Sequence, residues 1–233
     1  MPCTLPASLA DAAVCRGSFH AVWGGEAGEA VFADFSAALQ KAQAEGRILT
    51  ASLFRYENHL FFYAEGLNRP FTPQGLCPAL DAALLPWAPA LGEAAPRPWA
   101  AMQPYFYHDV PTTAADWQQG RCPQRRRGRI ALLPPDSWCS YMEHHLRIVT
   151  EGLVEGDRWH LICVQEGVLF SYLEEPRTNV NIKHRPGAHS PELDAWIAAD
   201  PESHFARFTP EQKAHPDSGH NFVFLPRIAG TED

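Results

Sequence analysis

The sequence lacks the features that mark membrane, secreted and nucleic-acid-binding proteins. Its 233 residues contain no apolar run near the roughly 18 residues that a membrane helix needs, and the N-terminus has no basic region followed by a long apolar core. The six cysteines lie far apart and form no C-x-x-C pair, so we expect buried thiols rather than a zinc knuckle or a disulfide framework. We therefore predict a cytoplasmic protein with no membrane partner.

An excess of positive charge is also lacking. The formal net charge is −8, which argues against nucleic acid as a partner. One basic run, Arg125–Arg129, lies between a proline and an apolar segment, and we interpret it as a solvated linker. Apolar residues make up 45% and charged residues 20%, as in an ordinary folded protein, and the length suits two units of about 100 to 120 residues.

Three segments recur about 110 residues apart and predict a duplicated chain. The matches are Leu60–Glu65 with Leu169–Glu174, Gly46 with Gly156, and Pro78–Ala82 with Pro191–Ala195. Because the matches keep their order, we predict an N-terminal repeat over residues 1–112, a linker over residues 113–127 and a C-terminal repeat over residues 128–233.

Both repeats show the predicted order βαββαβ. The first has strands at 18–23, 48–55, 59–65 and 99–110 and helices at 26–45 and 78–85; the second has strands at 129–133, 158–165, 168–174 and 221–227 and helices at 137–155 and 191–199. This is the ferredoxin-like order, in which both helices cover one face of an antiparallel sheet. We therefore predict an α+β protein whose tandem ferredoxin-like repeats pack sheet to sheet as an intramolecular α/β-barrel pseudo-dimer, in a monomer or homodimer.

The densest chemistry lies on the predicted helix over residues 137–155. One stripe of this helix is apolar and contains Cys139, Met142, Leu146, Val149 and Leu153. Beside that stripe, Tyr141 and His145 lie one turn apart on a common face, so a phenol and an imidazole look toward the same volume.

The alternation of side chains along a strand, its phase, decides which of them are expected to face this helix. An offset of 110 from the first repeat places Trp159 toward the helix and His160 on the opposite face of the sheet. The small Ser171 leaves room for a ligand, Trp196 comes from the second helix, and Trp138 lies at the entrance. The result is a predicted aromatic pocket with one titratable imidazole, which suits a monosaccharide because sugar C–H faces stack on aromatic rings.

The first repeat has Val31 and Phe35 at the positions of Tyr141 and His145, so we expect the site in the second repeat alone and a degenerate site in the first. A second interpretation stays open. A tyrosine and a histidine one turn apart on an amphipathic helix commonly serve as packing and surface residues, and tryptophans commonly lie in cores.

Several of these residues resemble the pattern of L-rhamnose mutarotases, small ferredoxin-like proteins that dimerise and interconvert sugar anomers. The resemblance rests on Tyr141 and His145 four residues apart, Gly156 before a strand, Leu169-Phe170, and the ending Phe222–Pro226. It implies an isomerase of carbohydrate metabolism in which His145 acts as general acid or base on the ring oxygen, Tyr141 or a water handles the anomeric hydroxyl, and no cofactor or metal takes part.

Two other functions are open. One is a non-catalytic protein that binds a sugar or another small molecule. The other is a haem-linked or cofactor-free monooxygenase, which rests on fold analogy alone. The histidines at 184, 189, 204, 215 and 220 fit no common metal signature, so no metal site is expected, and the segment Glu175–Ser190 is a candidate lid.

Overall fold

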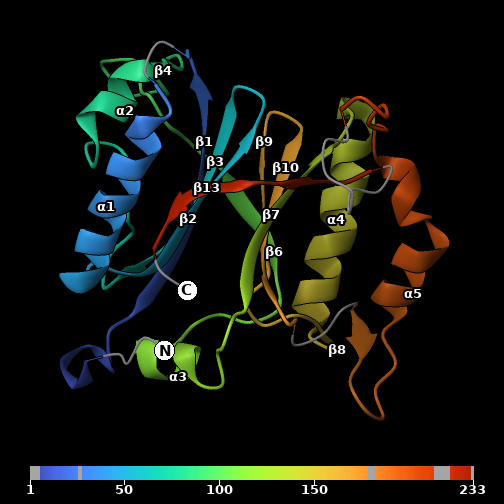
Figure 1. Ribbon diagram of the computed structural model, residues 1–233. Coiled ribbons are helices and arrows are strands. Elements are labelled where there is room, and N and C mark those ends of the chain that lie inside the picture. The colour runs from blue at the N-terminus through green and yellow to red at the C-terminus, as the bar shows by residue number, and fades with distance from the viewer. Residues whose placement is uncertain (1–5, 26–27, 178–181, 213–220, 232–233) are drawn as a thin grey trace. The chain divides into compact units, whose positions relative to one another are not determined.

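The computed structural model describes residues 6–25, 28–177, 182–212 and 221–231, and the chain is an α+β protein built on antiparallel sheets (Figure 1). It divides into two units. The first comprises Met1–Met102, Pro111–Pro123 and Pro226–Asp233, and the second comprises Gln103–Val110 and Gln124–Leu225. Within the described residues no helix is long and apolar enough to cross a membrane.

The first unit is a sheet in the order β13-β2-β3-β1-β4, with β5 also paired to β1. Its strands are β1 (Val14–Trp23), β2 (Ile48–Tyr56), β3 (His59–Leu67), β4 (Leu84–Leu85), β5 (Ala100–Ala101) and β13 (Arg227–Gly230); its helices are η1 (Ala7–Leu9), α1 (Ala30–Ala44), α2 (Pro78–Ala83) and α3 (Ala114–Gln118). Helices α1 and α2 lie on one side of this sheet (Figure 1). The rings of Phe35, Phe62 and Trp99 pack together in the core between these helices and the sheet, at centroid distances of 5.7 to 6.3 Å.

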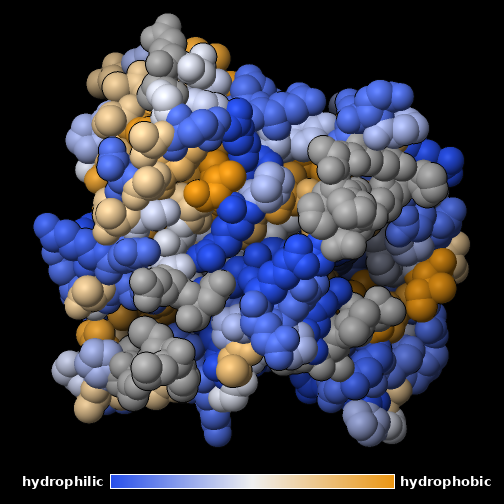
Figure 2. All heavy atoms as spheres, viewed as in Figure 1, coloured by the Kyte–Doolittle hydropathy of each residue, from blue (hydrophilic) through white to orange (hydrophobic). Residues whose placement is uncertain are grey.

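The second unit is a sheet in the order β12-β7-β10-β9-β6, with a separate two-stranded ribbon of β8 and β11. Its strands are β6 (Gln103–Tyr107), β7 (Arg125–Leu132), β8 (Val154–Glu155), β9 (Leu161–Gln165), β10 (Val168–Glu175), β11 (Lys183–His184) and β12 (Val223–Leu225); its helices are α4 (Pro135–Glu151), α5 (Pro191–Ala198) and η2 (Pro201–His204). Both α-helices begin with proline, whose missing N–H costs nothing in the first turn. On the face drawn in Figure 2, apolar residues gather over α1 and α2 of the first unit, whereas hydrophilic residues predominate elsewhere.

The predicted strands over 99–110 and 221–227 are each divided in the structure. Strand β5 pairs with β1 in the first unit, but β6, which follows one residue later, pairs with β9 in the second. Likewise β12 pairs with β7 and β13 pairs with β2, with Pro226 between them. Proline cannot donate a ladder hydrogen bond, which explains the break at 226. Each unit therefore contains a strand from a distant part of the sequence.

The basic run Arg125–Arg129 is not a solvated linker but the beginning of β7. Its residues pair in register with β10, so that Arg126 lies opposite Glu174 and Arg125 opposite Glu175. The guanidinium of Arg127 binds the carboxylate of Glu175 at 3.0 Å. Acidic partners on the neighbouring strand therefore allow a charged sequence to form a central strand.

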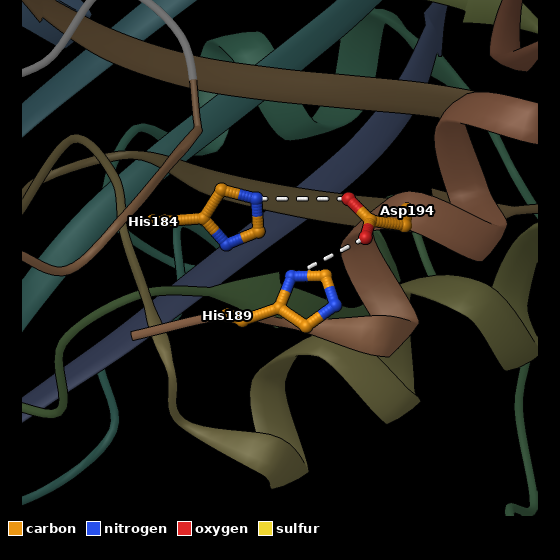
Figure 3. Close-up of side chains that lie close together, drawn as sticks. All are labelled: His184, His189 and Asp194. Carbon is orange, nitrogen blue, oxygen red and sulfur yellow. Dashed lines mark ion pairs between the residues drawn. The ribbon is translucent and has the colours of Figure 1, made fainter. Parts of the chain in front are cut away.

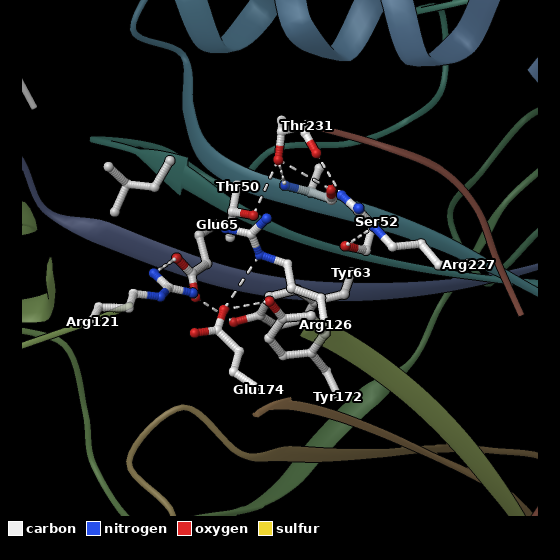
Figure 4. Close-up of polar contacts among 12 residues, drawn as sticks. Thr50, Ser52, Tyr63, Glu65, Arg121, Arg126, Tyr172, Glu174, Arg227 and Thr231 are labelled. Atoms are coloured by element: carbon white, nitrogen blue, oxygen red, sulfur yellow. Dashed lines mark hydrogen bonds and ion pairs between the residues drawn. The ribbon is translucent and has the colours of Figure 1, made fainter. Parts of the chain in front are cut away.

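Each unit also carries a buried tyrosine–glutamate pair, at positions 109 residues apart (Figure 4). In the first, Tyr63 donates to Glu65 at 2.6 Å, and Arg121 binds the same carboxylate through two nitrogens at 2.7 and 3.0 Å. Burial raises the pKa of Glu65, but Arg121, Arg16 and the Tyr63 hydroxyl together more than offset that effect, so the net pKa lies below its usual value. In the second, Tyr172 donates to Glu174 at 2.6 Å. Each carboxylate also has an arginine partner, Arg121 for Glu65 and Arg126 for Glu174 at 3.5 Å.

The predicted phase is wrong by one residue for the strand over 158–165 of the second unit. Leu53 pairs with Phe62 in the first unit and Ile162 pairs with Ser171 in the second, so the offset is 109 (162 − 53 and 171 − 62) and not 110. The value of 110 came from matching Gly46 with Gly156. Gly46 has φ +70° after α1, and the residue with that geometry after α4 is Gly152, at φ +67°.

Helix α4 also turns a different face to the core from the one expected. The predicted apolar stripe is partly exposed, and Leu146 is 62% accessible while Cys139 lies at the surface. The buried face consists of Tyr141, His145 and Ile148. The expectation of buried thiols holds for Cys77 and Cys163, whereas Cys122 and Cys139 are exposed.

Candidate functional site

A cavity of about 430 Å³ lies in the second unit, between the sheet, α4, α5 and η2. Its apolar wall is aromatic and contains Phe106, Trp196, Phe205 and Phe222. Its polar lining comprises Arg129, Tyr141, His145, His108, His160, Asp157, Arg177 and Glu202. Cavities of this size commonly hold small molecules.

Three of the predicted site residues come together at this cavity. The ring centroid of Tyr141 lies 4.2 Å from that of His145 and 5.3 Å from that of Trp196, and His145 lies 4.8 Å from Trp196. Helical spacing places the first two on one face of α4, and α5 packs against α4 and supplies the third. The imidazole is therefore enclosed by aromatic rings.

The other three predicted residues are not among those that line the cavity. Trp138 is 39% accessible and lines a separate apolar hollow with Pro134 and Pro135. Trp159 is buried, but because of the one-residue error in phase it is His160 that lines the cavity. Ser171 pairs with Arg129 on one side and Ile162 on the other, so it lies in the sheet between two residues of the cavity floor.

His145 presents an uncharged nitrogen to the site. Its Nδ1 lies 2.9 Å from the main-chain carbonyl oxygen of Tyr141, and because a carbonyl can only accept, the ring proton is on Nδ1 and Nε2 keeps its lone pair. Burial, with smaller contributions from the neighbouring His144, His204 and His108, lowers the pKa of His145 to about 4 against the carbonyl's opposing effect. At neutral pH the ring is a neutral acceptor.

The phenols of Tyr141 and Tyr105, which lie beside His145, stay protonated. Burial raises the pKa of Tyr141 to about 12 and raises that of Tyr105 well above its usual value. The ring of Tyr105 packs edge-on against Tyr141, with centroids 6.0 Å apart. The site therefore combines hydroxyl groups that can donate with an imidazole that can accept.

Arg129 brings a buried positive charge to the cavity. Its guanidinium carbon lies 4.3 Å from the centroid of Phe222, and its buried Nε has no hydrogen-bond partner among the described residues. Burial lowers its pKa to about 10, and the nearby Arg177 acts in the same direction, so it remains charged at neutral pH. By contrast, Arg177 pairs with the buried carboxylate of Asp157 at 3.4 Å.

Most of the polar lining is not predicted from the sequence. Arg129 was read as the end of a solvated basic run and the first residue of a strand, although its alternation with Ala131 and Leu133 places it on the face that meets the helices. Phe106 and His108 belong to a segment assigned to the first repeat, and no local signal reveals that β6 pairs with β9. Part of the candidate lid, residues 178–181, and the histidines at 215 and 220 lie outside the described residues.

Comparison with known proteins gives no family assignment. No family model matches the sequence, and no curated protein matches it. Among solved structures, a putative monooxygenase from Fusobacterium nucleatum subsp. nucleatum is 10% identical, with a TM-score of 0.41 and 94% of each chain covered. A putative monooxygenase from Lactobacillus acidophilus is 6% identical (TM-score 0.39, 94% of this chain and 96% of that one), and an anthrone oxidase-like protein is 7% identical (TM-score 0.36, 93% and 95%).

The predicted resemblance to L-rhamnose mutarotases is wrong, and the isomerase function and the role in rhamnose metabolism fall with it. No family model matches, and the solved structures are described as monooxygenases or an anthrone oxidase-like protein, none as a mutarotase. The motif residues also have structural explanations. Leu169 packs in the core, and Gly156 is needed because a Cβ there would overlap the ring of His108.

Proposed function

We propose that the second unit binds an aromatic small molecule that carries an anionic oxygen, such as a carboxylate, phenolate or enolate. The observation that carries this proposal is Arg129, a buried guanidinium without a hydrogen-bond partner for its Nε at an aromatic-walled cavity. A buried charged donor without a partner costs about 1–3 kcal/mol or more, and an anionic ligand offsets that cost. The rings of Phe106 and Trp196 supply apolar contact area for the rest of the ligand.

The remaining polar groups favour a ligand that both donates and accepts hydrogen bonds. In this proposal His145 accepts through Nε2, and Tyr141 donates through its phenol, because its raised pKa keeps it protonated. Trp196 forms the wall contributed by α5. A hydroxylated aromatic acid or phenol matches this combination of an apolar wall, a guanidinium with an unsatisfied Nε and a neutral acceptor.

Oxygenation of such a ligand is a second candidate function. The presence of both His145 and Arg129 in the lining of one cavity favours it. A neutral imidazole can remove a proton from an acidic methylene group, and a guanidinium stabilises the enolate that results. The enolate then reacts with molecular oxygen, converting the methylene to a carbonyl with release of one water. The base and the cation line the same cavity, which is what this chemistry requires.

The arrangement of elements supports an origin by duplication of a ferredoxin-like βαββαβ repeat. Residues 1–112 and 128–233 carry the same succession of helices and hairpins, and the β2–β3 and β9–β10 hairpins keep a constant offset of 109. In this proposal only the later repeat retains a ligand cavity between its helices and sheet. In the earlier one that volume is filled by Phe35, Phe62 and Trp99.

The binding proposal is tested with a hydroxynaphthoic acid and its methyl ester, which differ in charge but hardly in shape. By calorimetry the acid should bind more tightly than the ester, and Arg129→Met should weaken the acid about tenfold to a hundredfold while leaving the ester unchanged. Arg147→Met is the matched control, because Arg147 lies exposed on α4 and pairs with Glu143. Equal binding of acid and ester, or an unaffected Arg129→Met variant, would contradict the proposal.

The same protein distinguishes binding from oxygenation. Incubation with an anthrone, whose methylene is acidic, should consume oxygen and yield the corresponding quinone if the second candidate is right. His145→Gln should then stop oxygen uptake but retain binding of the hydroxynaphthoic acid. Binding of the anthrone without oxygen uptake would leave a binding protein and exclude the oxygenase.

A further inference from the structure

Three potential metal ligands meet where β11 leads into α5. His184 ends β11, His189 lies two residues before the helix, and Asp194 lies in the first turns of α5. One nitrogen of each ring and an oxygen of the carboxylate all lie within 4.8 Å of one another. Figure 3 shows both rings turned toward the Asp194 carboxylate. We propose that these residues bind a divalent transition-metal ion, with zinc preferred, at a site separate from the cavity.

The spacing of these atoms fits a metal better than it fits hydrogen bonds. Nε2 of His184 lies 3.6 Å from Oδ1 of Asp194, and Nδ1 of His189 lies 3.4 Å from Oδ2. Hydrogen bonds between nitrogen and oxygen are about 2.7–3.2 Å long. Ligands about 2.0–2.1 Å from a tetrahedral zinc lie about 3.3–3.4 Å apart. The two imidazoles face different oxygens of the carboxylate, and the three donor atoms lie within 4.8 Å of one another, so they need to draw together by about 1 Å to bind one ion.

The donor set selects the class of ion. Two imidazoles and one carboxylate suit zinc and its neighbours in the first transition series, whereas calcium and magnesium prefer oxygen ligands alone. Three protein ligands leave a fourth position for water or another ligand. The side chains are 35% to 75% accessible, so an ion reaches them from solvent.

The scaffold holds two of the three ligands in place. His184 pairs through its main chain with Val154 of β8. Asp194 is fixed by the N-terminus of α5, where the Ser190 hydroxyl accepts the N–H of Leu193 at 3.0 Å. His189 lies in the turn between them and is the most exposed, so it closes the site with little rearrangement of the helix.

Metal binding requires one local change. Nδ1 of His184 accepts the main-chain N–H of Ser190 at 3.1 Å, so in the neutral ring the proton is on Nε2, the atom that faces Asp194. A metal on Nε2 displaces that proton to Nδ1 and breaks the contact with Ser190. Such a hydrogen bond is worth about 1 kcal/mol, which is small beside the free energy of three metal–ligand bonds.

The test is calorimetric titration of untagged, metal-free full-length protein with Zn²⁺, with Mg²⁺ as the comparison ion. We expect one zinc per chain and no magnesium binding. His189→Gln and Asp194→Asn should each weaken zinc at least about tenfold, since even partners outside the ligand set change affinity by about tenfold to a hundredfold. Asp136→Asn is the matched control, because Asp136 occupies the first turn of α4, as Asp194 does in α5.

Nitrogen-15 spectra of the imidazole rings supply a readout that a merely structural role would not change. Zinc should move the proton of His184 from Nε2 to Nδ1, and the Ser190 amide should shift with it. The proposal is overturned if the wild-type chain binds no zinc, or if His189→Gln and Asp194→Asn bind zinc as tightly as the wild type does.

Discussion

The charge of His145 depends on burial, and burial makes the stability of the fold depend on pH. Its pKa is about 4 in the folded protein, against the ordinary histidine value of 6.5. Between these values the unfolded chain binds a proton that the folded chain does not, so the free energy of unfolding falls as pH falls. A full shift of this size corresponds to about 3 kcal/mol. The folded state therefore loses stability in mildly acidic solution.

We expect His145→Gln to reduce this dependence. Between about pH 6.5 and about pH 5 the wild-type chain should lose about 2 kcal/mol through His145 alone, and the variant should lose that much less. Urea unfolding of both proteins at the two pH values measures the difference. His189→Gln is the control, since the His189 side chain is 75% accessible. Parallel losses in the wild type and His145→Gln would show that the imidazole is not buried as described.

The relative position of two residues could be predicted where one rigid element holds both of them. Tyr141 and His145 were paired correctly because a helix places residues i and i+4 on one face whatever surrounds it. Trp159 was misplaced because strand phase depends on register, and a one-residue error turns every side chain to the other face. Arg129 was missed because its neighbours are charged, and the carboxylates that compensate that charge lie on another strand.

Helix α5 depends on the serine that precedes it. The buried hydroxyl of Ser190 accepts the N–H of Leu193 and donates to the carboxylate of Glu151 at the end of α4. A serine N-cap stabilises a helix by about 1 kcal/mol. Because the same hydroxyl connects α5 to α4, it also supports the wall that Leu193 and Trp196 present to the cavity.

Ser190→Ala should therefore lower the free energy of unfolding by about 1–2 kcal/mol, measured by urea unfolding at neutral pH. Ser137→Ala serves as the control. Ser137 lies in the first turn of α4, which has no side-chain cap, so its replacement by alanine should change stability by less than about 0.5 kcal/mol. If both variants unfold alike, the Ser190 hydroxyl is not a cap of α5.

Element type was more predictable than element partnership. The helices over 30–44, 135–151 and 191–198 and the two central hairpins follow from periodicity and from the tight turns that join their strands. The partners of β6 and β13 do not follow from the sequence, because the composition of a short strand does not reveal which sheet edge it joins. The basic strand β7 is another case, since only its pairing with β10 makes its burial possible.

At the scale of the molecule, the chain order and the order in space differ. The first unit includes Pro226–Asp233 at the far end of the sequence, and the second includes Gln103–Val110. Thr231 is 1% accessible. Its hydroxyl lies within hydrogen-bonding distance of the main-chain N–H and C=O of Ala51 and of the side-chain hydroxyl of Thr50, both in β2. Residues 227–231 therefore complete a sheet that begins at residue 14.

This connectivity predicts a long-range effect of a change near the C-terminus. Thr231→Val keeps the shape of the side chain but removes its hydroxyl, so the free energy of unfolding should fall by about 1–2 kcal/mol. Hydrogen exchange should accelerate at the amide of Ala51, which donates to that hydroxyl, and along β2, while the amides of β9 and β10 in the second unit stay protected. Thr209→Val, in the second unit, is the control. Faster exchange in β9 and β10 than in β2 would contradict the pairing of β13 with β2.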